Sequence, residues 1–245
     1  MNSLSGKVVI VTGASRGIGR AIAERLGREG VSVGVNFVQN ADLAQQVVAA
    51  IESGGGRGLA LQADMSKMTD VRRLFRQTEE HFGPLDILVH SAASFPVGAI
   101  SEVSEEEFDR AFALNAKGTF FALQEAARRI SNGGKIIYVS SCSTALSFAG
   151  FALYAGSKAA GEQFAKTLAK ELGGRGITVN SVSPGFTETD MLPKDPAWRK
   201  LGASMSVFNR LGQPAEVADV VAFLASDEAR WVTGQNIQAG GGVVM

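Results

Sequence analysis

The stretch Val8-Val9-Ile10-Val11-Thr12-Gly13-Ala14-Ser15-Arg16-Gly17-Ile18-Gly19 joins an apolar run to a turn that contains three glycines. The β-branched run predicts a strand that is buried on both faces. The residues that follow, 17–28, have the spacing of an amphipathic helix. A glycine-rich turn between a buried strand and a helix is typical of a fold that holds the phosphates of a dinucleotide at a helix N-terminus.

Each glycine of this turn has its own expected role. Gly13 permits a sharp turn, Gly17 lets the backbone approach a pyrophosphate, and Gly19 lets the helix pack closely on the sheet. The spacing is Gly-x3-Gly-x-Gly rather than the Gly-x-Gly-x2-Gly of the common dinucleotide fingerprint. A plain strand–helix turn therefore remains the alternative at this point.

The rest of the chain repeats the same alternation of short apolar runs and longer helical patterns. Strands are predicted over 7–11, 31–37, 58–62, 85–90, 135–140 and 178–183. Helices are predicted over 17–28, 41–53, 70–82, 105–130 and 153–172. This order predicts an α/β fold: a single Rossmann-type, doubly wound parallel sheet of about seven strands, with right-handed crossovers and helices on both faces. We expect one dinucleotide-binding and catalytic domain over residues 1–245.

Residues 184–212 interrupt this alternation. The segment is irregular and proline-containing, and it carries large apolar residues that include Met191, Leu192 and Trp198. Because ligands of doubly wound sheets bind at the carboxyl ends of the strands, we expect a small lid-like insertion over a substrate crevice. A helical hairpin that packs on the core is the alternative.

Composition narrows the classes of protein to consider. The 245 residues contain 24 basic and 24 acidic side chains, so no net field favours nucleic acid or an anionic membrane as a partner. The one cysteine, Cys142, excludes an intramolecular disulfide. We find neither a signal peptide nor an apolar stretch that approaches the roughly 18–20 residues of a membrane helix. We expect a cytoplasmic protein with no metal site, no nucleic-acid partner and no membrane contact.

The end of the second predicted strand bears on the choice of cofactor. An acid there would bind the ribose 2′-hydroxyl of NAD, but the strand ends at the neutral Asn36. Arg16, inside the glycine turn, offers a planar cation for a 2′-phosphate. We therefore expect NADP(H). Asp64, after the third strand, is a candidate hydrogen-bond partner for an adenine amino group, or else a strand-end cap.

Tyr154 and Lys158 indicate the chemistry beside this nucleotide site. They lie four residues apart in a predicted helix and therefore share one face of it. An ammonium one turn away would lower the pKa of the phenol from its usual value near ~10. Ser141 ends the fifth strand, so it should converge on the same crevice and hydrogen-bond a carbonyl oxygen while Tyr154 delivers a proton. Hydride from a reduced nicotinamide would complete the reduction.

Simpler explanations remain for these residues and for the whole chain. Tyr154 and Lys158 would then be an ordinary surface pair beside a strand-end serine. Two further functions also stay open: an NAD-dependent alcohol dehydrogenase acting on a small cyclic or polyketide-type substrate, and a catalytically silent nucleotide-sensing module.

The apolar lid residues, together with Phe95, Phe148 and Phe151, suggest a substrate with a large apolar surface.

These motifs together resemble the short-chain dehydrogenase/reductase family over essentially the whole chain. Residues 12–19 match its cofactor turn, and Ser141, Tyr154 and Lys158 match its catalytic set. The resemblance implies that Asn115 completes that set by holding a water that links the lysine to solvent. It also implies that the 184–189 segment contacts the nicotinamide carboxamide. The expected cofactor contacts are Gly13, Ser15, Arg16, Gly17, Ile18, Gly19, Asn36, Asp64, Met65, Ser91, Ala92, Ala93, Tyr154, Lys158, Pro184, Gly185, Thr187 and Thr189.

The subgroup most similar in appearance is the 3-oxoacyl-(acyl-carrier-protein) reductases. Segments 176–180, 184–191 and 210–214 carry this likeness, although such segments recur among reductases of other substrates. The likeness implies a ketoreductase, a homotetramer, and a carbonyl or alcohol substrate that an acyl carrier protein could carry. Arg128, Arg129 and Arg175 are the basic residues that could meet an acidic carrier.

One departure from the family pattern follows the fourth strand. Where the family usually has Asn-Asn-Ala-Gly, this chain has His90-Ser91-Ala92-Ala93. The alanines still allow close approach to the adenosine, but the hydrogen bonds of the missing asparagine must be remade. We expect His90 to act as a structural donor.

Overall fold

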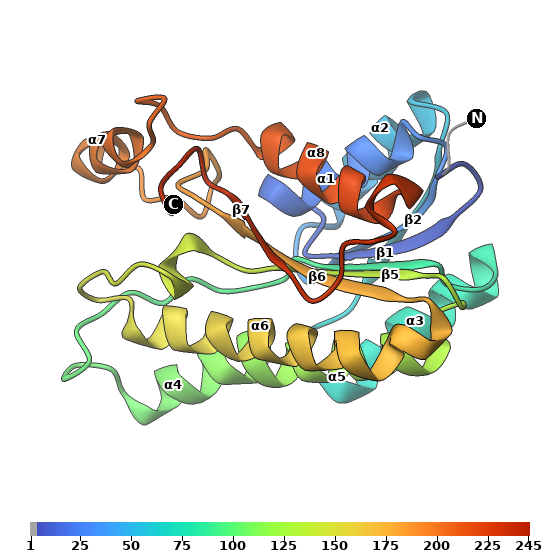
Figure 1. Cartoon of the computed structure of the whole chain (residues 1–245), viewed down its shortest axis with the longest axis horizontal. Coiled ribbons are helices and arrows are strands. Elements are labelled where there is room, and N and C mark those ends of the chain that lie inside the picture. The colour runs from blue at the N-terminus through green and yellow to red at the C-terminus, as the bar shows by residue number, and fades with distance from the viewer. Residues whose placement is uncertain (1–3) are drawn as a thin grey trace.

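The computed structural model describes residues 4–245, which form one seven-stranded parallel sheet covered by helices on both faces (Figure 1). The strand order is β3-β2-β1-β4-β5-β6-β7, and each neighbouring pair is parallel. The predicted doubly wound sheet is therefore confirmed. The strands are β1 (Val8–Thr12), β2 (Ser32–Phe37), β3 (Arg57–Gln62), β4 (Ile87–His90), β5 (Lys135–Val139), β6 (Thr178–Pro184) and β7 (Asn236–Ala239).

Burial distinguishes most of the predicted strands from the edge strand that the sequence missed. Every residue of β1, β2, β4, β5 and β6 is buried, as expected for apolar runs covered on both faces. The edge strand β7 is short and has no buried residue. It therefore lacks a continuous apolar run, and no strand was located there from the sequence.

Two groups of helices cover the sheet. In Figure 1, α1, α2 and α8 lie on one face, and α3, α4, α5 and α6 lie on the other. Each group packs its apolar residues against the sheet in a separate hydrophobic core. These helices are α1 (Gly17–Gly27), α2 (Ala41–Ser53), α3 (Met68–Phe82), α4 (Glu105–Phe112), α5 (Thr119–Arg129), α6 (Ala152–Leu172) and α8 (Pro214–Ala225). In the described part of the chain, no helix has both the length and the apolarity needed to cross a bilayer.

The long helix predicted over 105–130 is divided. A π-helical turn, η1 (Ala113–Gly118), separates α4 from α5. A side chain at Gly118 would overlap the carbonyl oxygen of Met65, so the wider turn passes directly against the segment after β3. Such π turns often occur at functional positions in helices. This one contains Asn115.

The segment predicted as a lid contains one helix rather than a hairpin. A loop leaves β6 and leads to α7 (Pro196–Met205), which stands beyond the sheet at the upper left of Figure 1. The Asp195 side chain caps α7 by accepting a hydrogen bond from the backbone of Ala197 at 2.8 Å. An ion pair between Glu188 and Arg199 ties the loop to the helix.

Candidate active site

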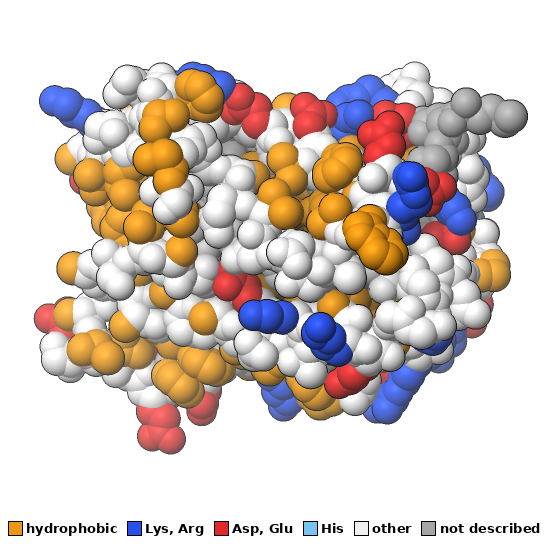
Figure 2. Space-filling model, in the orientation of Figure 1, with side chains coloured by type: hydrophobic (Ala, Val, Ile, Leu, Met, Phe, Trp, Pro, Cys, Tyr) orange, Lys and Arg blue, Asp and Glu red, His pale blue; other side chains and the backbone are white. Residues whose placement is uncertain are grey.

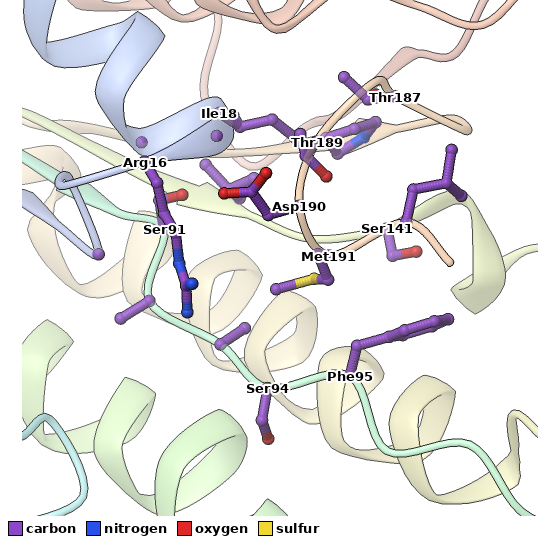
Figure 3. A pocket seen from close by; sticks show the side chains of 18 of the residues that line it. Arg16, Ile18, Ser91, Ser94, Phe95, Ser141, Thr187, Thr189, Asp190 and Met191 are labelled. Atoms are coloured by element: carbon purple, nitrogen blue, oxygen red, sulfur yellow. The ribbon is translucent and has the colours of Figure 1, made fainter. Parts of the chain in front are cut away.

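A cavity of about 640 Å³ opens at the carboxyl ends of the central strands. It runs from the glycine turn, past Tyr154, to the loop and helix α7 that follow β6. All the predicted site residues line it except Asp64 and Asn115. The sequence thus located one continuous site, and Figure 3 shows part of its lining.

The glycine turn forms a narrow cradle at one end of the cavity. Gly13 and Gly17 have φ values of +63° and +57°, which favour glycine. A β-carbon at Gly19 would overlap the carbonyl oxygen of Gly13, and one at Gly13 would lie 2.9 Å from the Cα of Ala92. At Gly13 and Gly19 there is room only for the hydrogen atom of a glycine. Neither residue has a side chain that could cover the start of α1, so an anion can approach the helix there.

Asn36 supports this cradle from β2. Its side-chain oxygen accepts a hydrogen bond from the Gly13 backbone at 3.1 Å, and its amide donates to the Ala63 carbonyl at 2.9 Å. The residue is fully buried. Asn36 therefore holds the glycine turn to the segment after β3, a role that the sequence pattern did not reveal.

Arg16 lies at the same end of the cavity. Its backbone forms the N-cap of α1, and Figure 3 shows its side chain extending beside Ser91. The lining residues that follow β2 are Phe37, Val38, Gln39 and Asn40. None of these four described residues carries a carboxylate, so none of them would repel a phosphate.

Asp64 does not reach the cavity. Its carboxylate accepts hydrogen bonds from the backbone of Ser66 at 3.0 Å and from the Ser66 hydroxyl at 2.7 Å. Lys67 lies 3.6 Å away from the same carboxylate. The geometry is that of the strand-end cap, the alternative that the sequence had left open, whereas the neighbouring Met65 does line the cavity.

Ser141 is oriented by a residue that sequence reasoning missed. The Ser141 hydroxyl accepts hydrogen bonds from the Ser143 backbone at 3.2 Å and from the Ser143 hydroxyl at 2.9 Å. Both acceptor positions of the Ser141 oxygen are then used, so its own proton must be donated, and the hydrogen bond between Ser141 and Tyr154 is such a contact. The Ser-x-Ser spacing, which is typical of local side-chain turns, was the available signal.

The pKa of Tyr154 is shifted in the direction opposite to the expected one. Burial raises the pKa of Tyr154 to about 12, against a hydrogen-bond contribution from Ser141 that lowers it. Lys158 is not among the groups that shift this pKa. The expected lowering by the ammonium one turn away is therefore wrong for the chain alone. The phenol is protonated near neutral pH and can serve as a proton donor.

The position of the Lys158 ammonium explains why it does not lower the pKa of Tyr154. Its ammonium donates a hydrogen bond to the Val139 carbonyl at 2.6 Å and lies 4.6 Å from the centroid of the Tyr138 ring. Burial lowers the pKa of Lys158 to about 7, and the negative charge of Glu162 opposes this. The ammonium has two further protons for other partners.

The Asn115 side chain links two segments next to the cavity by hydrogen bonds. Its amide donates to the carbonyl of Ser94 and to the hydroxyl of Ser157, each at 3.0 Å. Its oxygen accepts from the Ser94 backbone at 2.9 Å. The π turn therefore ties the chain after β4 to α6, the helix that carries Tyr154. The side chain is buried and does not line the cavity.

Thr12 and His90 form hydrogen bonds in place of those expected from an asparagine after β4. The Thr12 hydroxyl accepts hydrogen bonds from the backbones of Ser91 and Ala92 at 2.9 and 3.0 Å. Its own proton must then go to the Nδ1 atom of His90, 3.0 Å away. Burial, with a smaller contribution from Lys158, lowers the pKa of His90 to about 3, so the ring is neutral. His90, which we expected to be a hydrogen-bond donor, therefore accepts a hydrogen bond in its contact with Thr12.

Aromatic side chains enclose the other end of the cavity. The Phe95 ring packs edge-on against Tyr154 at a centroid distance of 4.8 Å. Phe151 stacks on Trp198 of α7 at 5.6 Å and an interplanar angle of 12°. Phe148 bridges Phe151 and Phe186 at 5.2 and 5.7 Å. Of these rings, the sequence had not pointed to Phe186. Figure 2 shows further hydrophobic side chains over α7 on the outer face.

Comparison with known protein families gives one match over most of the chain. A family model described as enoyl-(acyl carrier protein) reductase matches residues 13–244. The short chain dehydrogenase/reductase AacuN of Aspergillus aculeatus is 42% identical over 254 residues, covering 98% of this chain and 96% of the relative. The versicolorin reductase stcU of Emericella nidulans is 41% identical over 253 residues, with the same coverage of 98% and 96%.

Solved structures give the same result. The angucycline C-6 ketoreductase LanV with bound NADP superposes with a TM-score of 0.94 at 45% identity, covering 98% of this chain and 96% of that one. A short chain dehydrogenase from Burkholderia cenocepacia in complex with NADP has a TM-score of 0.95 at 40% identity and covers 98% and 99%. The fold described above is therefore shared across nearly the full length of these proteins.

Proposed function

Since the chain belongs to the short-chain dehydrogenase/reductase family, we propose that it uses NADPH to reduce the carbonyl group of a polycyclic aromatic ketone to an alcohol. One observation carries this proposal. The buried phenol of Tyr154 lies in the same cavity as the glycine cradle and faces a wall of aromatic rings. In this position Tyr154 would act as a proton donor between a nucleotide and an apolar substrate.

The residues of the cradle fit a phosphorylated dinucleotide. The start of α1 would hold the pyrophosphate, and Arg16 would pair with the 2′-phosphate. Two structural neighbours were solved with bound NADP, which supports this choice over NAD. When bound, the reduced nicotinamide supplies the hydride.

Three side chains would move and hold the proton. The proton of the Ser141 hydroxyl, which is directed at Tyr154 in the chain alone, would hydrogen-bond the substrate carbonyl oxygen, and Tyr154 would protonate that oxygen. The high pKa of Tyr154 keeps its proton available at neutral pH. Lys158 donates to the Val139 carbonyl in the chain alone, so it would have to turn one of its two further protons toward the phenolate oxygen to stabilise the tyrosinate that forms. Asn115 would keep the Ser94 segment and α6 in register.

The aromatic wall supports the substrate class. Flat rings would pack against Phe95, Phe151 and Trp198, which are already edge-on or stacked. The relatives stcU, a versicolorin reductase, and LanV, solved with NADP and rabelomycin, are consistent with such a substrate.

A carrier-bound substrate has less support. Arg129 pairs with Glu125 and Glu79, and Arg128 also pairs with Glu125. Arg175 donates to the carbonyls of Ala127 and Ile130 and to the Asn132 side chain. The arginines that could have met an acidic carrier are thus engaged within the chain. We therefore propose a free ketone rather than one carried by an acyl carrier protein.

The test is an NADPH-oxidation assay over a panel of carbonyl compounds. We expect turnover with polycyclic aromatic ketones and much slower turnover with acyl thioesters or short aliphatic ketones. Rates with NADH equal to those with NADPH would overturn the cofactor assignment. A chain that binds NADPH but reduces none of the panel would instead be a nucleotide-sensing module.

Arg16→Ala tests the 2′-phosphate contact. We expect the Kd for NADPH to rise by roughly 10–100-fold, because a charge-assisted hydrogen bond contributes about 1.5–3 kcal/mol. The Kd for NADH should change little. Fluorescence titration measures both. Arg28→Ala, which removes an exposed arginine at the other end of α1, is the matched control. Equal losses for both nucleotides would contradict the assignment.

Trp198→Ala tests the aromatic wall. We expect KM for a polycyclic ketone to rise roughly tenfold, because a lost aromatic contact and its buried area together approach that energy. The KM for a short aliphatic ketone should be unaffected. Trp231→Ala makes the same change at a side chain that is 96% exposed and lies outside the cavity. Steady-state kinetics with both substrates would refute this role if the two variants behaved alike.

The homotetramer and the cytoplasmic location implied by the resemblance stay predictions. Light scattering on the purified chain would test the first, and fluorescent tagging in the source cell would test the second.

A further inference from the structure

Glu162 extends the functional face of α6 by one turn. Tyr154, Lys158 and Glu162 follow each other at four-residue intervals and therefore lie along one stripe of the helix. The first two belong to the proposed mechanism. Glu162 does not line the cavity, so any effect that it has on the reaction must pass through other residues.

Hydroxyl groups from three segments converge on one oxygen of Glu162. Its Oε1 atom accepts from Ser140 at 2.5 Å and from Thr144 at 2.7 Å. The Ser183 hydroxyl of β6 lies 3.4 Å from the same oxygen, but its proton has a nearer acceptor in the Asn236 side chain at 2.8 Å. Ser140 is buried, at 4% exposure, so its hydroxyl needs this acceptor. A carboxylate provides strong hydrogen bonds to such donors.

The two donors stand on either side of Ser141 in the sequence. Ser140 comes directly before it, and Thr144 comes at the end of the short 3₁₀ turn, Cys142–Thr144, that follows. The Thr144 hydroxyl also lies 2.8 Å from the Ser141 carbonyl, so its proton can serve either acceptor. Glu162 therefore holds both ends of the Ser141 turn to the helix that carries Tyr154.

Glu162 also acts on the charge of Lys158. Its negative charge raises the pKa of Lys158, against the burial that lowers it. The other titratable groups around this ammonium are Tyr154 on the same helix, Tyr138 on β5 and His90 on β4. His90 is neutral, and both phenols are protonated at neutral pH. Glu162 is thus the anion of this group.

We propose that Glu162 is a positioning residue that sets the Ser141 hydroxyl relative to the Tyr154 phenol and, from one helical turn away on α6, favours the charged form of Lys158. This inference rests on the proposed ketone reduction, since Ser141 and Tyr154 must act on one carbonyl oxygen. The two roles are separable, because the first needs an acceptor oxygen and the second needs a charge.

Three variants distinguish these roles. Glu162→Ala removes both, and we expect kcat to fall roughly tenfold or more, the scale of a misplaced catalytic group. Glu162→Gln keeps an acceptor oxygen, so it should recover part of that loss. Thr144→Val removes one donor but leaves the charge, so kcat should fall while the pH profile stays in place. The Kd for NADPH should remain within about threefold for all three.

The pH profile gives the second readout. Removal of the carboxylate lowers the pKa of Lys158 further, so its proton is lost at lower pH. The alkaline limb of kcat should therefore move to lower pH in Glu162→Gln and Glu162→Ala, and not in Thr144→Val. Glu171→Ala changes an exposed glutamate of the same helix and is the matched control, with an unchanged rate and profile.

Each outcome decides one of two claims. If the wild-type chain reduces no ketone, the proposed function fails, and the inference fails with it. If the wild type is active and Glu162→Ala retains its kcat within about twofold, the inference alone fails. A rate loss with no shift of the alkaline limb overturns the charge role. If Glu162→Ala does not fold, the comparison of Glu162→Gln with Thr144→Val decides both roles.

Discussion

Replacement of Tyr154 with phenylalanine is expected to lower kcat by about 10²–10⁴-fold, the usual contribution of a general acid. The variant keeps the ring that packs edge-on against Phe95 at 4.8 Å and loses only the hydroxyl that would protonate the substrate. Binding of NADPH should stay within a few-fold of wild type, because the substitution leaves the glycine cradle and Arg16 unchanged. Stopped-flow or steady-state NADPH oxidation measures the rate, and fluorescence titration measures the affinity.

The chain provides a matched control for this substitution. Tyr138 is its other tyrosine, and the hydroxyl of Tyr138 donates to the Lys158 carbonyl at 3.3 Å. Tyr138→Phe removes an equivalent atom and preserves the ring beneath the Lys158 ammonium. We expect it to retain most of the activity. Survival of more than a tenth of the wild-type rate in Tyr154→Phe would contradict the proton-donor role.

Gly19→Ala is expected to weaken NADPH binding about tenfold or more and to destabilise the fold by about 1–3 kcal/mol. The added β-carbon would overlap the carbonyl oxygen of Gly13, a backbone atom that cannot rotate away. Either α1 or the turn must then shift, which misaligns the amides at the helix start. Denaturant unfolding and NADPH titration measure the two effects.

Gly173→Ala is the control for the glycine substitution. This glycine follows α6 with helical angles, φ −55° and ψ −38°, and has nothing within 4 Å of an added β-carbon. Alanine should be neutral or slightly stabilising there, since it restricts the unfolded chain. If Gly19→Ala bound NADPH as tightly as Gly173→Ala, the cradle would not be the phosphate site.

The elements that the sequence located well share one property. β1 and β5 are largely apolar runs in which every residue is buried, and the glycine turn depends on the local angles of Gly13 and Gly17. Such features are encoded by neighbouring residues, so periodicity and residue type reveal them. The pairing of Tyr154 with Lys158 on one helical face belongs to the same class.

Other features could not be found in this way. The π turn around Asn115 breaks a helical pattern that looks continuous in the sequence, because Gly118 must pass against the backbone of Met65. Asp64 had two reasonable roles, and only the position of Ser66 distinguished them. Both outcomes depend on atoms contributed by other segments or by side-chain rotamers, which residue spacing does not specify.

By itself, the sequence determined the doubly wound sheet, and it predicted the phosphate cradle and the residues that would transfer the proton, since each follows from local spacing. Only the tertiary structure decided the protonation of Tyr154, the aromatic wall and the convergence of hydroxyls on Glu162. Burial and hydrogen bonding between distant segments set these properties, because a pKa or a binding surface depends on everything packed around it.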